Sequence, residues 1–522
     1  MMPRFKPLNY QQHSMVVINY LDQLQPGTFE HAIHHLIDEK LDLSVFYPRY
    51  KNDDNGRPAY DPAALLKIIL FAYSKGITSS REIQWCCETN VIFKALSCDS
   101  VPHFTTIAAF VSGRRKEIEQ VFEQVLLICH TQGLLGNELF AIDGCKMPSN
   151  ASKEWSGTFK ELEAKRAKLK RQIRYHMTEH EKLDKSDAAE EVRQQRAEQA
   201  IETLNKAHDK IDQFLKTHNP RMGKGKRIKE VKSNITDNES AKMTTSKGTI
   251  QGYNGVATVD KKHQIIVDAR VFGEGQEHHT LQPVLAGIRE RFRRLAISDD
   301  ILKAQTIITA DTGFANEQNM QYLHEQGINA YIPDNQFRQR DPKFNEQKRK
   351  YGKRHQDKKV RKQAVIPASE FSFDPIKHQC VCPAGQRISF RGIRKNEQGI
   401  KIAYFEGKLL QCRHCDKKQQ CMHNPSAADH RKGAGRQVSF RLDAEREPTY
   451  TDWMKHRVDS AQGKQIYSHR MSTVEPVFGN ITVNKQLRRF SLRGTAKVQS
   501  QWTLFCLIHN IEKLNHYGQL AA

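Results

Sequence analysis

Two short apolar runs along the chain each lead directly into an aspartate. Leu139–Ile142 precedes Asp143, and Thr306–Ala310 precedes Asp311, with a glycine close behind each aspartate. A short apolar run that is closed by turn residues predicts a buried β-strand. We therefore expect each strand to end at its aspartate, which places both carboxylates at an edge of one sheet.

The segments around these strands predict the rest of a layered core. Residues 252–259 and 264–270 indicate two strands joined by a short turn, and 281–295 indicates an amphipathic helix. A helix over 316–326 and a strand over 329–333 follow the second aspartate. This order of elements favours a mixed α/β fold in which both aspartates lie near the middle of the sheet.

Residues 1–130 carry the pattern of short helices joined by tight turns. Asp61 and Pro62 suit the N-cap and the first position of one helix. Further helices are predicted to start within Thr78–Ile83 and within Ser100–Ile107. A helix-turn-helix-like DNA-binding domain and a plain helical bundle both fit this pattern.

Two insertions interrupt the predicted core, which we assign to residues 131–335 and 466–522. Residues 153–235 hold a helical hairpin, because 159–214 is rich in Glu, Lys, Ala and Leu and contains neither glycine nor proline. Such a charged hairpin is typical of a spacer or of a dimerisation arm. Residues 336–465 form the second insertion, which is basic and contains cysteines.

The second insertion combines a basic run with a group of cysteines. Residues 338–362 contain twelve Lys or Arg against three Asp or Glu, which is typical of phosphate-backbone binding or of a solvated loop. Five cysteines follow: Cys380, Cys382, Cys412, Cys415 and Cys421. Their spacing is similar to that of a zinc ribbon, in which thiolates hold a structural Zn²⁺, and it fits buried cysteines equally well.

The overall composition restricts the class of protein. Of the 522 residues 38% are hydrophobic and 27% are charged, and no apolar stretch reaches the length of a membrane span. The first residues lack an apolar signal segment, so we expect a cytoplasmic protein without a membrane partner. Eleven cysteines in such a chain argue against a disulfide framework. Lys and Arg outnumber Asp and Glu 82 to 59, and the net charge of +23 favours a nucleic-acid partner over a basic surface that binds nothing.

A third acid, Glu475, lies at the predicted start of a helix. Hydrolysis of a phosphodiester needs an activated oxygen nucleophile and neutralised charge, and two divalent ions supply both. Mg²⁺ and Mn²⁺ prefer carboxylate oxygens, so Asp143, Asp311 and Glu475 are the predicted ligands, with Asp143 shared between the ions. Each acid considered singly also fits a turn or a cap. That structural role is our interpretation of four other acids: Asp237, Asp260, Asp268 and Glu274.

Basic and aromatic residues flank Glu475. Tyr467 and Arg470 precede it and Arg488 and Arg489 follow it, so these side chains are predicted to hold DNA phosphates beside the metal ligands. With these residues in view, the chain resembles the insertion-sequence transposases of the DDE type over most of its length. The motifs that carry the resemblance are Ala141-Ile142-Asp143-Gly144, Ala310-Asp311-Thr312-Gly313-Phe314, and Tyr467-x-x-Arg470 followed by Val474-Glu475-Pro476-Val477-Phe478-Gly479.

The resemblance implies a ribonuclease-H-like core and Mg²⁺ or Mn²⁺ at the three acids. Its implied substrates are double-stranded DNA, namely the terminal inverted repeats of a mobile element and the target DNA. It also implies a homo-oligomer on DNA and a bacterial, nucleoid-associated protein. The implied reaction is hydrolysis at the element ends followed by strand transfer. A catalytically inactive DNA-binding regulator and a stand-alone metal-dependent nuclease are the alternatives.

The chain departs from this family at two points. Family members usually carry a lysine seven positions after the glutamate, where this chain has Thr482. The nearest lysine is Lys485, which is the predicted substitute at the DNA. In addition, four residues rather than the usual three separate Arg470 from Glu475.

Overall fold

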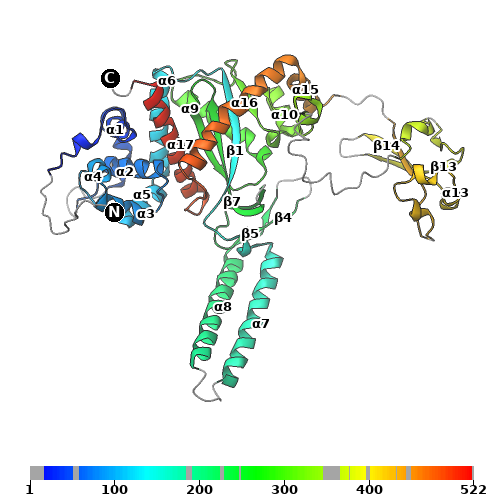
Figure 1. The fold of residues 1–522 in the computed structure, drawn as a ribbon, viewed down its shortest axis with the longest axis horizontal. Coiled ribbons are helices and arrows are strands. Elements are labelled where there is room, and N and C mark those ends of the chain that lie inside the picture. The colour runs from blue at the N-terminus through cyan, green and yellow to red at the C-terminus, as the bar shows by residue number, and fades with distance from the viewer. Residues whose placement is uncertain are drawn as a thin grey trace, which may run out of the picture. The chain divides into compact units, whose positions relative to one another are not determined.

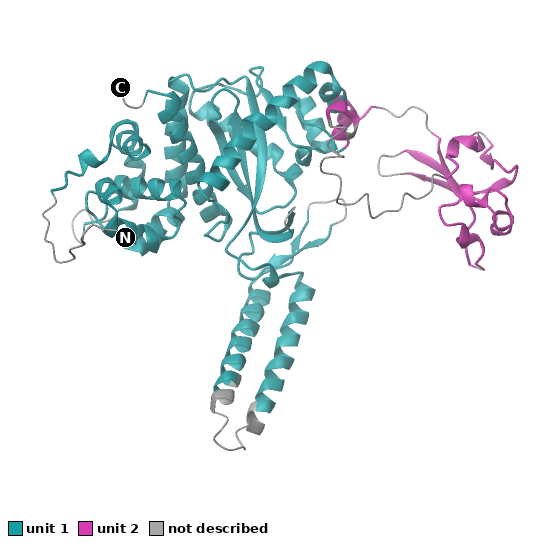
Figure 2. Ribbon diagram, in the orientation of Figure 1, with its two compact units in different colours: residues 1–335, 454–522 teal, residues 336–453 magenta. Residues whose placement is uncertain are grey.

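The computed structural model divides the chain into two compact units (Figure 2). Unit 1 comprises residues 1–335 and 454–522, and unit 2 comprises 336–453. The boundary falls inside helix α15 (Tyr450–Asp459), so residues 454–465, which the sequence analysis assigned to the second insertion, belong to unit 1. The structure describes residues 17–50, 58–183, 191–223, 228–245, 248–344, 365–375, 377–395, 400–430, 432–442 and 448–519.

Unit 1 begins with a helical region, as the sequence predicts. Asp61 caps helix α2 by accepting a hydrogen bond from the Ala63 amide at 2.7 Å, and Pro62 occupies the first helical position. Helices α3 and α5 start at Ser80 and Phe104, inside the two predicted ranges. The helices of this region are α1 (Phe29–His35), α2 (Pro62–Ser74), α3 (Ser80–Thr89), α4 (Val91–Ser97), α5 (Phe104–Gly113) and α6 (Arg115–Thr131).

A mixed six-stranded sheet forms the core of unit 1 (Figure 1). Its strands lie in the order β10-β9-β1-β7-β6, and β8 also pairs with β7. Strand β1 is interior, because it runs parallel to β9 on one side and antiparallel to β7 on the other. The mixed α/β core and the helical N-terminal region are thereby confirmed. The strands are β1 (Leu139–Pro148), β6 (Ala241–Thr245), β7 (Gly248–Asp260), β8 (Ile266–Phe272), β9 (Ile307–Ala310) and β10 (Ala330–Tyr331).

Strand β1 continues past Asp143, and the prediction that it ends there was wrong. Asp143 pairs with Ala257 of β7, and the pairing runs on to Pro148. Gly144 was interpreted as a turn residue, whereas it lies inside the strand and packs closely against Asn254. A Cβ atom at this position would lie 2.7 Å from Oδ1 of Asn254, which is too close for two uncharged heavy atoms to pack.

The remaining helices of unit 1 pack on this sheet. Helix α9 contacts β8, and α16 contacts β1, β7, β9 and β10. Helix α17 contacts both β8 and the N-terminal helices, and its side chains from Trp502 to Ile511 are buried. It therefore joins the helical region to the sheet. These helices are α9 (Leu281–Arg294), α10 (Glu317–Glu325), α15, α16 (Ala461–Gly479) and α17 (Thr495–Tyr517).

A helical hairpin within unit 1 follows β1, at the position that the sequence predicts (Figure 1). It consists of α7 (Phe159–Leu183) and α8 (Glu191–Thr217), and Leu162, Leu169, Ile211 and Phe214 form its apolar core. Neither helix, nor any other helix within the described residues, is long and apolar enough to cross a membrane. Short strands flank the hairpin: β2 (Ser156–Gly157), β3 (Arg221–Met222), β4 (Glu230–Val231) and β5 (Ser233–Asn234).

Unit 2 is built on a five-stranded antiparallel sheet with its own small apolar core. Residues 345–362 of the predicted basic run lie outside the described residues. The strands follow one another in sequence order as β11 (Ser372–Asp374), β12 (Gln379–Val381), β13 (Arg387–Lys395), β14 (Lys401–Glu406) and β15 (Gln437–Arg441). The helices are α11 (Phe337–Arg340), α13 (Leu409–Arg413) and α14 (Lys418–Cys421).

Candidate active site

Asp143, inside β1, and Asp311, directly after the end of the parallel strand β9, lie side by side. Ile142 of β1 pairs with Ala310 of β9, and each aspartate is the next residue along its chain. Strand β9 ends at Ala310 while β1 continues, so the two aspartates lie together at the point where β1 no longer has β9 as its neighbour. The sheet therefore brings together two of the three acids that the sequence singled out.

The guanidinium of Arg470 connects the two aspartates. Its Nη1 donates a hydrogen bond to Oδ2 of Asp143 at 2.9 Å, and its Nη2 lies 3.8 Å from Oδ1 of Asp311. Helix α16 presents this side chain to the sheet, and only 6% of it is exposed. Its Nε is buried and makes no hydrogen bond within the described structure. The sequence analysis expected Arg470 to contact DNA, whereas here it contacts the acids.

Burial and neighbouring charges shift the pKa values of Asp143 and Arg470. It raises the pKa of Asp143, and the nearby charge of Arg470 and the Gly144 amide lower that pKa only in part, so its net shift is upward. Burial alone would lower the pKa of Arg470, but Asp143, Tyr467 and Asp311 together raise it above its usual value. Arg470 therefore stays charged, and Asp143 gains from any additional cation that approaches it.

A further acid, Glu277, belongs to the same site and was missed from the sequence. Its Oε1 lies 3.3 Å from Nζ of Lys146, which is on β1 three residues after Asp143. Burial raises the pKa of Glu277, Lys146 lowers it, and the charges of Asp143 and Asp311 raise it again. The signal that could have found it is the acidic turn after β8, where the sequence analysis singled out only Glu274.

The turn after β9 is shaped around Glu277. A Cβ atom at Gly313 would collide with Oε2 of Glu277, so a larger residue at that position would displace this carboxylate. Asp311 begins this turn and is the N-cap of the short helix Thr312–Phe314. The sequence Asp311-Thr312-Gly313 therefore contributes one acid, Asp311, and leaves space at Gly313 for the carboxylate of Glu277.

Glu475 lies in the last turns of α16, and the prediction that it opens a helix was wrong. The helix begins at Ala461, where the Ser460 side chain accepts a hydrogen bond from the Gly463 amide. Pro476 suggested a helix start, but it lies inside the helix. At 3.6 residues per turn, Glu475 points about 140° around the axis from Arg470. It is exposed, whereas Arg470 faces the sheet.

The other residues predicted at the DNA have different surroundings. Tyr467 lies one turn before Arg470, whose guanidinium is 5.9 Å from the centre of the tyrosine ring. Lys485 is buried and ion-paired with Glu512 of α17, so it supports the fold rather than facing solvent. The hydroxyl of Thr482 donates a hydrogen bond to the Phe478 carbonyl at 2.7 Å.

The basic loop after α16 is fixed to the end of β1. Arg489 donates a hydrogen bond to Oδ1 of Asn150 at 2.6 Å, and Arg493 donates one to the Asn150 carbonyl at 2.6 Å. The Phe490 amide donates to the carbonyl of Pro148 at 2.9 Å. Arg488 and Arg489 remain exposed in this loop. Exposed arginines are thereby held close to the strand that carries Asp143.

The four acids that were interpreted as structural have structural partners. Asp260 accepts hydrogen bonds from the amides of Gly136, Asn137 and Lys262. Asp268 is ion-paired with Arg270 and with Arg291. Asp237 accepts a hydrogen bond from the Tyr253 hydroxyl at 2.7 Å, and Glu274 is paired with His279 at 3.0 Å.

The five cysteines of unit 2 separate into two groups. Cys380 is buried in the apolar core of the unit. The other four line one cavity: Cys382, Cys412, Cys415 and Cys421. Neither these thiols nor the acids of unit 1 are already arranged to hold a metal ion, since no group of three or more His, Cys, Asp or Glu within the described residues meets that condition.

Comparison with known protein families gives two matches along the chain. Residues 19–113, in the helical region, match a family described as a transposase domain (DUF772). Residues 381–515, which run from β12 of unit 2 to α17, match a family described as a transposase DDE domain. The second match contains Tyr467, Arg470 and Glu475. No curated protein matches the chain.

Proposed function

We propose that this chain is an insertion-sequence transposase of the DDE type and that it hydrolyses phosphodiesters at the ends of a mobile DNA element. Its two matches to transposase domains support this proposal. The exposed 3′-hydroxyls are then joined to target DNA at the same site. The sheet order supports a ribonuclease-H-like core, because β8, β7 and β1 are successively antiparallel while β9 and β10 are parallel to β1.

The observation that carries this proposal is the pair of aspartates around one guanidinium. A single cation, that of Arg470, lies within 3.8 Å of both carboxylates. Two carboxylates that share one cation also fit a divalent ion, and their hard oxygens suit Mg²⁺ or Mn²⁺. Asp143 and Asp311 would hold this metal, and Glu475 would have to turn towards them to serve as the third ligand, because it is exposed and points away from the side of α16 that carries Arg470. When bound, the metal activates the attacking oxygen and neutralises the phosphate.

The residues around the acids bind and orient the DNA in this proposal. Arg488 and Arg489 hold the phosphates that flank the reacting one, because their loop is fixed to the end of β1 by Asn150. Arg470 keeps the two aspartates in place. Tyr467 packs against Arg470 and thereby limits its movement. The N-terminal helices recognise the terminal repeats, and a homo-oligomer holds two ends.

The chemistry requires no energy source besides the phosphodiester itself. In the first step water attacks the phosphorus, and the 3′-oxygen leaves as a hydroxyl after taking up a proton. In the second step this 3′-hydroxyl attacks a phosphodiester of the target, so that one bond forms as another breaks. Both steps are in-line displacements at phosphorus, which is why one set of carboxylates serves both.

The test is cleavage of a supercoiled plasmid that carries the element's own ends, in the presence of Mg²⁺ or Mn²⁺. We expect cleavage at the ends by the wild type, and a loss of about 100-fold or more for Asp143→Asn, Asp311→Asn and Glu475→Gln. Binding of the end DNA should be retained by all three variants. Arg441→Gln, an exposed change in unit 2, is the matched control and should cleave normally.

Each outcome decides between the proposed function and its alternatives. A wild type that binds the ends without cutting them identifies a regulator. Cutting without joining of pre-cleaved ends to target DNA identifies a nuclease. Activity that survives in the Asp143 or Asp311 variant would show that the site lies elsewhere.

A further inference from the structure

Four cysteines of unit 2 converge on one cavity, although the chain separates them by up to 39 positions. The cavity has a volume of about 40 Å³, and Cys382, Cys412, Cys415 and Cys421 all line it. Cys382 follows β12, Cys412 lies in the last turn of α13, Cys415 lies two residues after that helix, and Cys421 ends α14. All four are free thiols.

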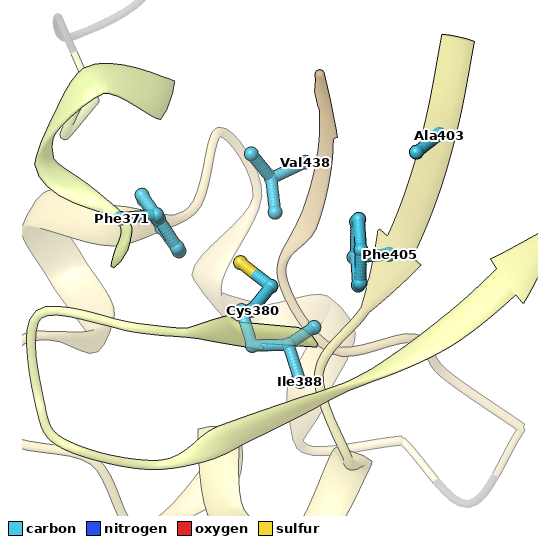
Figure 3. Packing of buried hydrophobic residues seen from close by; sticks show 6 residues of the cluster. All are labelled: Phe371, Cys380, Ile388, Ala403, Phe405 and Val438. Carbon is cyan, nitrogen blue, oxygen red and sulfur yellow. The ribbon is translucent and has the colours of Figure 1, made fainter. Parts of the chain in front are cut away.

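Cys380 does not belong to this group. It is 1% exposed and lies among the apolar side chains of the sheet. Figure 3 shows its sulfur near Phe371, Val438 and Ile388, inside the packed core. Cys382 differs from it because it lies one residue past the end of β12 and is only partly buried. The structure therefore reduces the five cysteines to a set of four.

Backbone amides are directed at two of the four sulfur atoms. The amide of Gln386 donates a hydrogen bond to Sγ of Cys382 at 3.3 Å, and the amide of Arg436 donates one to Sγ of Cys412 at 3.4 Å. A tight turn at Gly385, with φ of +76°, brings the first of these amides back towards its sulfur. Amides that point at sulfur stabilise a thiolate more than a thiol.

The cavity also concentrates positive charge around the thiols. Lys417, Lys418 and Arg436 line it together with the four cysteines. Four thiolates that line one cavity would repel one another, so a bound cation that shares their charge stabilises them.

The stretch that carries three of the four cysteines has short regular elements and is held in part by polar contacts, such as the bond from Arg413 Nε to the Ala428 carbonyl at 2.8 Å. Between β14 and β15 the regular structure consists of α13, α14 and a 3₁₀ turn (Pro425–Ala428), of five, four and four residues. The apolar core of the unit takes no fully buried residue from this stretch. Small units with cores of this size commonly depend on a metal or on disulfides.

We propose that Cys382, Cys412, Cys415 and Cys421 bind one Zn²⁺ ion as a closed, structural four-thiolate site. Four sulfur ligands without an open position are typical of structural zinc, and soft thiolates select it over Mg²⁺. The thiols are not yet arranged as ligands within the described residues. Binding would require the four side chains to reorient around the ion, and the thiol protons pass to solvent on binding.

The test uses the full-length chain, purified with zinc present and then dialysed, with metal content measured by mass spectrometry. We expect one zinc per chain for the wild type and its loss in Cys382→Ser, Cys412→Ser, Cys415→Ser and Cys421→Ser. Cys380→Ala is the matched control, because it removes the neighbouring thiol that lies in the apolar core. It should retain the zinc.

A second measurement on the wild type does not depend on whether the variants fold. Titration with a mercurial reagent should release the zinc as four thiols react, and Co²⁺ in its place should give the absorption of a tetrahedral thiolate site. A wild type that holds no zinc, or serine variants that keep it, would overturn the proposal. Disulfides among the four cysteines would overturn it as well. None of these outcomes depends on DNA cleavage.

Discussion

At the scale of single residues, Arg470 determines how the candidate active site behaves without metal. It holds a positive charge between Asp143 and Asp311, two carboxylates that would otherwise repel each other. Breaking a buried ion pair from one side costs more than the pair contributes, because the remaining charge is left without a partner. In the proposed function, Arg470 and a divalent ion would therefore stabilise the same two acids.

Substitution of Arg470 tests this shared role. For Arg470→Ala we expect the free energy of unfolding in EDTA to fall on the order of 3 kcal/mol. The loss should be smaller in Mg²⁺, because the metal then compensates the aspartates. Urea unfolding in both conditions measures the two values. Arg488→Ala, an exposed change in the neighbouring loop, serves as the control and should change neither. An equal loss with and without Mg²⁺ would contradict the account.

The sequence was sufficient for part of the site at this scale. The repeated pattern of an apolar run followed by an aspartate led to Asp143 and Asp311, and the structure places Asp143 inside β1 and Asp311 directly after the neighbouring strand β9. Glu277 could not be found in this way, because only the packing of its turn against Gly313 brings it to the aspartates. The contact of Arg470 with both acids also depends on the angle of α16, which no local pattern encodes.

At the scale of elements, α17 completes the edge of strand β8. The side-chain carboxamide of Asn510 accepts a hydrogen bond from the backbone amide of Ile266 and donates one to the backbone carbonyl of Ile266, both at 2.8 Å. Gln499 bonds in the same manner to the Val271 amide and the Ala269 carbonyl. These side chains satisfy backbone groups that a neighbouring strand would otherwise satisfy. The helix thereby replaces a strand at this edge.

His509 makes the attachment of α17 sensitive to acid. Its Nε2 donates to the Gln264 carbonyl at 2.9 Å, and Nδ1 accepts from Asn480 at 3.1 Å, so the ring is held neutral. Burial lowers the pKa of His509 to about 3 from the ordinary value of 6.5, although the bond to Gln264 raises it in part. Below pH 6.5 the unfolded chain therefore takes up a proton that the folded chain does not.

The sign of this difference gives a prediction for stability. His509 contributes fully to the free energy of unfolding above its pKa in the unfolded chain. This contribution is lost as the pH falls from that pKa towards its pKa in the folded chain, by up to about 1.4 kcal/mol per pH unit. We expect His509→Gln to be less stable than the wild type at neutral pH and to lose less stability on acidification. Urea midpoints across this range measure both slopes. Parallel slopes for the two proteins would contradict this assignment.

Sequence patterns located most elements and misjudged two of their ends. The hairpin β7–β8, the helices α9 and α10 and the strand β10 were all predicted at nearly their observed positions. The end of β1 was misjudged because a glycine directly after an aspartate resembles a turn signal in the sequence. In the structure, Gly144 instead makes room for Asn254 inside the sheet. The start of α16 was misjudged because Pro476 is tolerated close to the end of an existing helix.

At the scale of the whole molecule, the chain has two separate cores with different chemistry. Unit 1 carries the carboxylates and its sheet, and unit 2 carries the four cysteines. The family match from residue 381 to 515 includes parts of both. The composition pointed to a nucleic-acid partner through the net charge of +23, but it could not say which surface binds it. Locating the DNA-binding surface requires the fold. The hydrogen bonds of Asn150 with Arg489 and Arg493 hold the arginine loop close to the strand that carries Asp143.

The central claim is that Asp143 and Asp311 bind the metal directly, and exchange of one ligand tests it most closely. The measurement is cleavage of end-bearing plasmid DNA by Asp311→Cys in Mg²⁺ and in Mn²⁺, with Asp311→Ser as the control. A thiolate binds Mg²⁺ poorly and accepts softer ions, so we predict activity that is lost in Mg²⁺ and returns in Mn²⁺ for the cysteine variant alone. If both variants respond alike to the two metals, Asp311 is not a metal ligand and the account is contradicted.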